Sequence, residues 1–174
     1  MKPKPKSQNK IKVPYRDEYE LWKLWRRSSH LMVRARDIEV RPFHVSPIQA
    51  GVLMFLKEHT EPCTPADISR WLMREPHAVS QLLDRMEKQG LVIKTKDTKR
   101  KNLVRVKMTE KGEEIYHGVR RIKICQKVLN NLTQAELNTL WSALDKMQDI
   151  AIQELLKNNQ LRFLLAQNSA DKIA

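Results

Sequence analysis

Residues 76–112 read PHAVSQLLDRMEKQGLVIKTKDTKRKNLVRVKMTEKG, and the spacing of their apolar residues changes once along the stretch. Before Gly90, apolar residues recur at the i, i+3, i+4 and i+7 positions typical of an amphipathic helix. They are Val79, Leu82, Leu83 and Met86. After Gly90, apolar and polar residues alternate in two short segments, as they do in the strands of a hairpin. The stretch therefore predicts a helix over residues 76–89, ended by Gly90, and a two-stranded hairpin behind it.

The tip of the predicted hairpin carries more positive charge than a reversal of the chain needs. Short hairpin turns are usually rich in Gly and Asn, whereas this hairpin has a single acidic residue, Asp97, among its basic ones. Between positions 94 and 107 the basic residues are Lys94, Lys96, Lys99, Arg100, Lys101, Arg105 and Lys107. A basic hairpin can reach phosphates or a narrow minor groove of DNA. The alternative, a charged hairpin that is merely solvated, is disfavoured by the motif that precedes it.

Two helix starts precede the opening stretch. Residues 46–49, SPIQ, match an N-cap with a capping box, and residues 64–67, TPAD, repeat the pattern. Pro76 opens a further helix almost at once. Two short helices separated by about three residues match a helix-turn-helix. Together with the hairpin, residues 46–108 are predicted to form a winged helix-turn-helix DNA-binding domain.

The helix over residues 76–89 leaves small and hydrogen-bonding side chains opposite its apolar stripe. Such side chains can reach base edges in the major groove of DNA. The residues predicted to contact DNA from this helix and the turn before it are Arg74, His77, Ala78, Ser80, Gln81 and Arg85. Of these, His77, Ser80 and Gln81 are expected to contact bases. The residues predicted to contact DNA from the wing are Lys96, Lys99, Arg100 and Lys101.

The composition favours a nucleic-acid partner over several other classes of function. The 174 residues include 33 Lys and Arg against 20 Asp and Glu, which gives a net charge of +13. Such a field attracts polyanions. The 4 glycines are scattered, and no phosphate loop, nucleophile–base set or metal-ligand spacing in the sequence indicates an enzyme. Two cysteines and the lack of an apolar run of membrane-spanning length predict a cytoplasmic protein.

The flanking segments complete a fold class that is mainly α with a small β-wing. The helix that begins at Tyr15 should stop before Pro42 and carries more apolar residues than one small domain needs. A helix from Thr109 to about Leu129 and a second one after it are predicted to form an antiparallel hairpin. The expected segments are a disordered basic tail (1–14), a first dimerisation helix and loop (15–45), the winged helix-turn-helix (46–108), a C-terminal dimerisation helix hairpin (109–158) and a C-terminal tail that can include a short helix (159–174).

The chain resembles the MarR (multiple antibiotic resistance regulator) family of winged-helix repressors. The resemblance is carried by VSQLLDRMEKQGLV at residues 79–92, by the basic wing, and by VKMTEKG at residues 106–112. It implies an obligate homodimer formed by the terminal helices, with two winged helix-turn-helix lobes. Wings of the family carry an Asp-Arg-Arg-like run shortly before the second strand. Here Arg100, Lys101 and Asn102 take those positions and Asp97 lies further out, so the family's internal Asp–Arg pair has no evident counterpart.

The resemblance also implies an effector pocket, because members often bind small aromatic acids between the dimer helices and the DNA lobe. The candidate pocket residues are Trp22, Trp25, Arg26, His30, Phe43 and His44. The alternative is that these aromatic residues are plain core. Cys63 and Cys125 are expected to be small buried hydrophobes and not oxidation sensors. His44, Glu113 and His117 fall where zinc-sensing members bind metal but form no clustered ligand set, so no metal or other cofactor is expected.

These features predict a homodimeric, sequence-specific regulator of transcription that acts as a repressor. Two recognition helices would enter successive major grooves, about 34 Å apart, on a pseudo-palindromic double-stranded operator. A small aromatic or anionic effector would change the spacing of the lobes and release the DNA. The alternative is a nonspecific architectural protein associated with DNA or RNA, which would bind without sequence preference.

Overall fold

The computed structural model describes residues 15–59, 63–97, 103–158 and residue 161. Along the chain its elements are α1 (Tyr15–Val40), the 3-10 helix η1 (Arg41–Phe43), α2 (Pro47–Glu58), α3 (Pro65–Leu72), α4 (Pro76–Lys88), β1 (Val92–Lys96), β2 (Val104–Met108), α5 (Glu110–Val119), α6 (Lys123–Leu129) and α7 (Gln134–Lys157). The predicted fold class, mainly α with a small β-wing, is confirmed. No helix among the described residues is long and apolar enough to cross a membrane.

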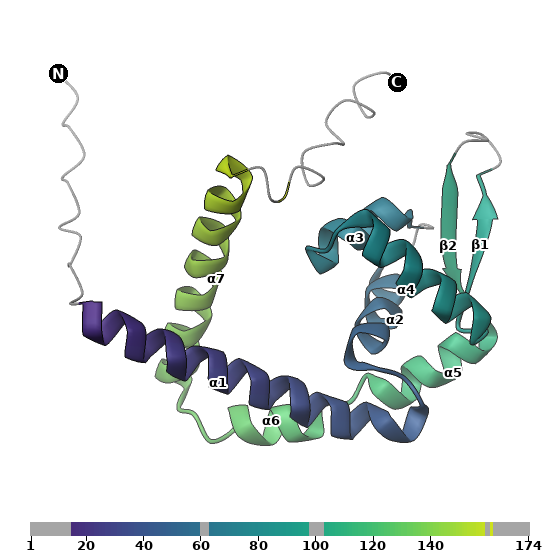
Figure 1. The fold of residues 1–174 in the computed structure, drawn as a ribbon. Coiled ribbons are helices and arrows are strands. Elements are labelled where there is room, and N and C mark those ends of the chain that lie inside the picture. The colour runs from purple at the N-terminus through teal and green to yellow at the C-terminus, as the bar shows by residue number, and fades with distance from the viewer. Residues whose placement is uncertain (1–14, 60–62, 98–102, 159–160, 162–174) are drawn as a thin grey trace, which may run out of the picture.

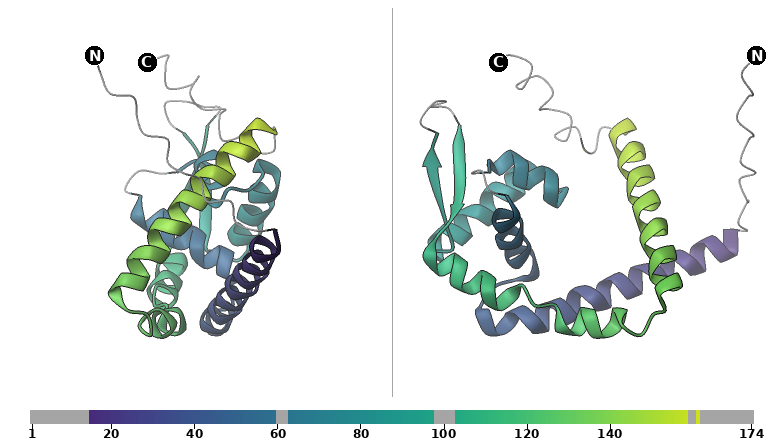
Figure 2. Two further views of the ribbon diagram at one scale, coloured as in Figure 1. Left: turned by 90° about the vertical axis from the view of Figure 1, so that its left-hand side faces the viewer. Right: turned by 180° about the vertical axis from the view of Figure 1, so that it is seen from behind.

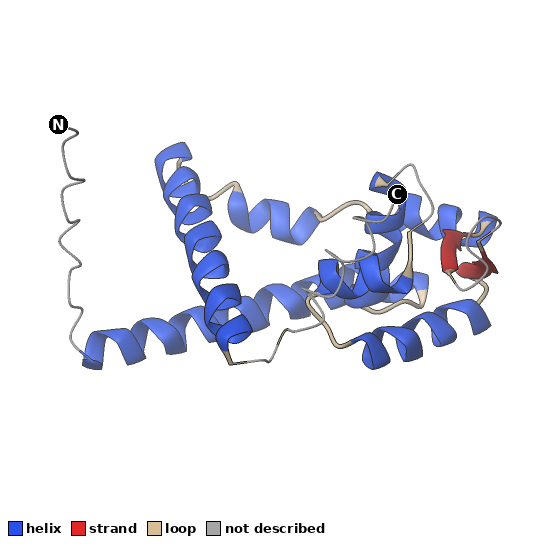
Figure 3. Cartoon of the chain, turned by 90° about the horizontal axis from the view of Figure 1, so that it is seen from above, coloured by secondary structure: helices blue, strands red, loops and turns tan. Residues whose placement is uncertain are grey.

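The described chain has a lobe at one end and a projecting helix at the other (Figure 1). Helices α1 and α6 run along a common base, and the lobe of α2, α3, α4, α5 and the two strands stands on one end of it. Helix α7 rises from the other end, which is also clear from behind in the right view of Figure 2. Seen from above in Figure 3, the strands lie at the end of the molecule away from the start of α1.

The helix starts predicted from local sequence are present in the structure. The Ser46 hydroxyl accepts a hydrogen bond from Gln49 N at 3.4 Å, and Gln49 Oε1 accepts one from Ser46 N at 2.9 Å. Thr64 and Asp67 form the same capping box at the start of α3. Helix α4 begins at Pro76 without a side-chain cap, and Gly90 follows its end with a φ of 71°, a left-handed conformation that favours glycine.

The lobe has one apolar core, onto which the wing is built. Its fully buried side chains include Val52, Leu53, Ile68, Val79, Leu83, Met86, Leu91, Val92 and Val106. Strands β1 and β2 are antiparallel, with Lys94 opposite Val106. Val106 N also donates to Cys63 O at 2.7 Å, which ties β2 to the segment before α3. Strand β2 is therefore bonded both to β1 and to the lobe.

The segment after Thr109 differs from the prediction. The expected continuous helix to Leu129 was wrong, because the chain breaks into α5 and α6 between Val119 and Lys123. In Figures 1 and 2, α7 then stands at a steep angle to α6 and does not lie back along α5. The side chains of Arg36 and Glu39 occupy the break, and their hydrogen bonds to its backbone replace the helical ones that are lost there.

Two helices expose large apolar side chains that nothing in the described part of this chain covers. No residue of α7 is buried, and its Trp141 side chain is 78 % exposed. The exposed large apolar residues are Tyr19, Leu21, Trp22, Leu24, Trp25, Leu31, Val33 and Ile38 on α1, and Leu140, Trp141, Leu144, Met147, Ile150 and Leu155 on α7. Apolar patches of this extent on a protein surface mark sites of association.

Candidate nucleic-acid interface

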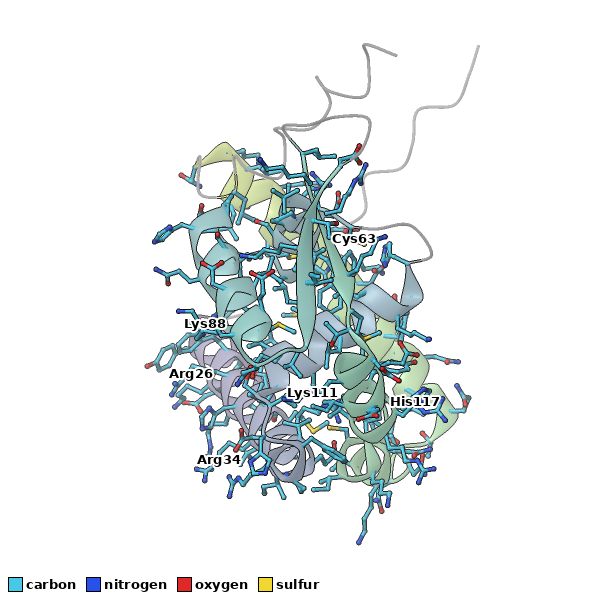
Figure 4. All side chains as sticks on the ribbon, turned by 90° about the vertical axis from the view of Figure 1, so that its right-hand side faces the viewer. Arg26, Arg34, Cys63, Lys88, Lys111 and His117 are labelled. Atoms are coloured by element: carbon cyan, nitrogen blue, oxygen red, sulfur yellow. The ribbon has the colours of Figure 1, made fainter. Side chains whose placement is uncertain are left out.

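The exposed face of α4 carries the side chains predicted to read bases. Val79, Leu82, Leu83 and Met86 point into the core, and this leaves His77, Ala78, Ser80, Gln81 and Arg85 exposed on the other side. His77 Nε2 and Gln81 Nε2 lie 3.0 Å apart, one helical turn from each other. In Figure 4, Lys88 extends from the last turn of α4. The outer face of α4 thus presents hydrogen-bonding groups without apolar bulk, as a major-groove helix requires.

The turn from α3 to α4 is fixed by a buried serine that the sequence analysis missed. The Ser69 hydroxyl donates to Arg74 O at 2.5 Å, and Arg74 N donates to Ser69 O at 3.0 Å. Met73 adopts a left-handed conformation with a φ of 50° and closes α3. Arg74 itself is exposed at the N-terminal side of α4, where it was expected. A serine among helix-forming residues gives no local signal for such a role, since its partner is set by the turn.

Lys94 joins the wing to α4, in an arrangement called here the wing clamp (Lys94, Asp84 and Glu87). The Lys94 ammonium pairs with Asp84 and lies 3.1 Å from Glu87 Oε2, while Lys94 N donates to Glu87 Oε1 at 2.8 Å. In the sequence, Lys94 is one of the seven basic residues of the wing. The structure shows that its charge is already engaged by two carboxylates.

The clamp shifts the pKa values of all three groups. The side-chain hydrogen bond from Lys94 lowers the pKa of Asp84, and the Lys94 backbone N–H followed by its side chain lowers that of Glu87. The bonds to Asp84 and then Glu87 raise the pKa of Lys94. The clamp's contribution is therefore complete between the ordinary carboxyl values of 3.8 and 4.5 and the ordinary lysine value of 10.5. It is lost as the pH falls through the lowered carboxyl pKa values or rises through the raised pKa of Lys94.

Replacing Lys94 with Met should lower affinity for a specific DNA site by about tenfold or more, because it loosens the wing and leaves the charges of two carboxylates uncompensated beside the exposed face of α4. Adding Asp84→Asn should restore part of the affinity. Lys107→Met is the matched control, since Lys107 is exposed on the other face of the hairpin and has no place in the clamp. Equal reductions for Lys94→Met and Lys107→Met, measured by fluorescence anisotropy, would contradict the role given to the clamp.

The wing has an internal Asp–Arg brace, although the residues at the family's usual positions do not supply it. Arg105 Nε donates to Asp97 Oδ2 at 2.7 Å, and Asp97 N donates to Leu103 O at 2.8 Å. The structure therefore has an internal Asp–Arg pair, which had no evident counterpart in the sequence. The arginine is the second residue of β2 and does not come from the tip. Lys96 is exposed at the end of β1, while Lys99, Arg100 and Lys101 lie outside the described residues.

Two small cavities open where the base meets the lobe, and Phe43 lines both. One, of about 300 Å³, is lined by Glu39, Phe43, His117, Gly118, Arg121 and Lys123. The other, of about 220 Å³, is lined by Phe43, His44, Val45, Gln89, Leu91, Lys111 and Ile115. Both combine an aromatic ring with basic side chains, which suits a small organic anion.

The six candidate effector residues do not form one site within a single chain. Phe43 and His44 line cavities, whereas Trp22, Trp25, Arg26 and His30 are exposed on α1 between residues 22 and 30. From Trp25 to Phe43 the chain advances about 20 Å or more along a helix. Figure 4 shows Arg26 and His117 far apart across the molecule. A pocket that includes both groups would have to draw them from two chains.

The cysteines and histidines form no other evident site in the described part of the chain. Burial is the main cause that raises the pKa of both the Cys63 and the Cys125 thiol, so neither is prepared as a thiolate. His117 Nε2 lies 3.6 Å from Glu113 Oε1, and Glu113 also pairs with Lys57. Among the described residues, no group of three or more His, Cys, Asp or Glu side chains is arranged to hold a metal ion.

Comparison with known proteins gives related sequences over the winged helix. Residues 45–101 match the model of the MarR family. The chain is 31 % identical over 97 residues to the HTH-type transcriptional repressor MdtR of Bacillus subtilis (strain 168). That alignment covers 53 % of this chain and 61 % of the relative, so the chain spans about three fifths of the length of the curated relative it matches.

Solved structures share the fold over most of the chain. The organohalide-sensing transcriptional regulator RdhR, in its ligand-free form, is 28 % identical and matches with a TM-score of 0.72 over 87 % of this chain and 90 % of its own. The same regulator has been solved with 2,4-dichlorophenol bound, at a TM-score of 0.71 over 86 % of this chain and 89 % of its own. MepR of S. aureus in complex with DNA is 23 % identical, with a TM-score of 0.70 over 79 % of this chain and 98 % of its own, and supports the fold alone.

Proposed function

Because the chain belongs to the MarR family, through the winged helix-turn-helix of residues 45–101, we propose that it is a homodimeric, sequence-specific DNA-binding repressor of transcription. The observation that carries the proposal is the exposed face of α4, which a buried serine and the wing clamp hold beside a basic hairpin. Helix α4 would enter the major groove, and the wing would reach the flanking backbone or minor groove. The protein would act in the cytoplasm, where its operator lies.

The uncovered faces of α1 and α7 support the homodimer. A monomer would leave six large apolar residues of α7 in water, whereas a second copy would supply an equivalent face. A twofold dimer would place two copies of α4 about 34 Å apart, one turn of DNA, on a pseudo-palindromic operator. Both the operator and the twofold axis are part of the proposal.

A small aromatic or anionic compound is the proposed effector. The cavities at Phe43 offer an aromatic ring next to Arg121, Lys123 and His117, or next to Lys111. In a dimer the first half of α1 of the second copy, with its Trp and Arg side chains, could complete such a pocket. The dimer would have one state whose lobe spacing matches the operator and one whose spacing does not. An effector that binds the second state more tightly would shift the population toward it and release the DNA.

The direct test is selection of bound duplexes from a random pool by the full-length protein, followed by affinity measurements at physiological salt. A specific repressor should prefer the selected sequence over a scrambled duplex by about 10³-fold or more. The alternative, a nonspecific architectural protein of DNA or RNA, predicts similar affinity for both and a strong salt dependence throughout. Small aromatic acids can then be screened for release of the selected duplex.

Changing Arg100 and Lys101 to Ala should weaken binding to all duplexes and reduce the slope of log affinity against log salt by about 0.9 for each phosphate that the variant no longer neutralises. The preferred sequence should stay the same, because phosphate contacts carry no base information. The measurement is a salt titration of wild type and variant on one duplex. An unchanged affinity and slope would remove the tip of the wing from the interface.

A further inference from the structure

The junction between α5 and α6 is held by side chains from another helix. Helix α5 ends at Val119, and α6 begins at Lys123 after Ile122, which provides no side-chain cap. The Arg36 guanidinium of α1 donates to Val119 O and, at 3.1 Å, to Arg121 O. Glu39, one helical turn further along α1, accepts a hydrogen bond from Ile124 N. One pair of side chains thus binds the end of one helix and the start of the next.

The charges of this pair match the helix ends that they meet. A cation stabilises a helix C-terminus and an anion an N-terminus, because of the unpaired carbonyl and amide groups there. Arg36 Nη1 also lies 3.1 Å from Glu39 Oε2, and the two side chains are only 14 % and 8 % exposed. Arg36, Glu39 and the backbone of residues 119–124 are called the elbow below.

A buried ion pair is weak evidence for stability alone, because apolar residues of the same size often pack as well or better. An ion pair instead fixes the relative orientation of the groups it joins, because its hydrogen bonds are satisfied in only one geometry. The elbow is also sterically tight. A Cβ added to Gly118 would lie 2.1 Å from Phe43 Cε1, so the Phe43 ring already rests on the α5 backbone. Both features oppose a change in the angle at which α5 meets α1 and α6.

We propose that Arg36 and Glu39 are positioning residues that set the separation of the two operator half-sites. The proposal rests on the proposed function, because it presumes a DNA-binding dimer. Helix α5 belongs to the lobe, to which Lys57 of α2 ties it through Glu113, while α6 leads into the uncovered α7 (Figure 1). The elbow therefore lies between the part that contacts DNA and the part that contacts the second copy.

A small rotation at the elbow is enough to change the register on DNA. With 10 residues, α5 is about 15 Å long, so a rotation of about 15° moves its far end by about 4 Å, more than one base-pair step of about 3.4 Å. The two lobes move by symmetry, which doubles the effect on their separation. Loosening the elbow should accordingly broaden or shift the preferred half-site spacing without altering the bases that each half-site prefers.

The experiment compares full-length wild type with Arg36→Met and Glu39→Gln on duplexes whose two half-sites are moved apart or together by one base pair at a time. Wild type should lose about tenfold in affinity for one base pair off the optimum, while both variants should lose about threefold or less, or show a shifted optimum. Affinity for a duplex with a single half-site should be unchanged. Circular dichroism and sedimentation establish that each variant is folded and dimeric.

Lys57→Met is the matched control, because it removes an ion pair to α5 that lies within the lobe; it should keep the wild-type spacing profile. If Arg36→Met does not fold, Glu39→Gln carries the test, since it removes the charge and keeps the shape. Folded variants with the wild-type profile would overturn the inference and leave the proposed function intact. A wild-type protein with no preferred duplex at all would overturn both.

Discussion

Leu144→Asp is expected to convert the protein to a monomer and to lower its affinity for a selected operator by about 100-fold or more. Leu144 is 41 % exposed on α7, in line with the apolar residues at 140, 147 and 155. Because less than half of the side chain is exposed in one chain, covering it in the proposed dimer contributes only about 0.6–1.2 kcal/mol per copy. Burying a carboxylate in each copy costs several kcal/mol more. The total loss per dimer then exceeds about 3 kcal/mol, a factor above 100 in the association constant.

Ser142→Asp adds the same charge on the opposite side of α7 and is the matched control. It should sediment as wild type does and bind DNA with similar affinity. Sedimentation equilibrium gives the dimer constant, and anisotropy on the selected duplex gives the DNA affinity. If Leu144→Asp stays dimeric, or if wild type is a stable monomer, α7 is not the dimer helix.

Gly112→Ala should destabilise the lobe by about 3 kcal/mol, the upper end of the usual range for overpacking. The glycine lies at the corner where the wing returns to α5. Gly112 N donates to the Thr109 hydroxyl at 3.0 Å, and that hydroxyl donates to Gly90 O at 2.6 Å. A Cβ at Gly112 would lie 2.1 Å from Leu91 O and 2.7 Å from Met108 Cγ. Since the nearest atom is backbone, α5 would have to move away from β1.

Gly51→Ala serves as a control, because it is expected to raise the stability that Gly112→Ala lowers. Gly51 is inside α2, and an added Cβ would meet the Trp71 ring at 3.5 Å, an ordinary contact. Replacing a helical glycine with Ala gains about 0.5–1 kcal/mol. Urea unfolding of the two variants should therefore move in opposite directions from wild type. A stability for Gly112→Ala equal to or above that of wild type would contradict the packing described at this corner.

Features that depend on neighbouring residues could be predicted from the sequence. The capping boxes at residues 46–49 and 64–67 act over three residues, so their pattern alone gave two helix starts. The apolar spacing of α4 likewise predicted its buried and exposed faces, because a helix repeats every 3.6 residues. Gly90 marked the end of α4 because few other residues adopt its positive φ.

Features that depend on distant residues could not be predicted. Glu39 and Ile124 are 85 positions apart, and no local pattern pairs them, so the break after α5 was missed. Nothing in the sequence distinguishes Lys94 from the other lysines of the wing. Only the packing of β1 beside α4 shows that it faces two carboxylates. For the same reason Arg105 was not recognised as the partner of Asp97. The number of charged residues in the wing could be read from the sequence, but the ion pairs that they form could not.

The central claim is that α4 reads bases in two symmetric half-sites, and the most direct test is a duplex selection repeated with Gln81→Ala. Gln81 is exposed on α4 and carries an amide that can form two hydrogen bonds with the major-groove edge of one base. The variant should relax base preference at one position, by about 1–3 kcal/mol, and do so at the symmetry-related position of the second half-site as well. Ser142→Asp should reproduce the wild-type preference. Identical preferences for wild type and Gln81→Ala at every position would contradict the claim.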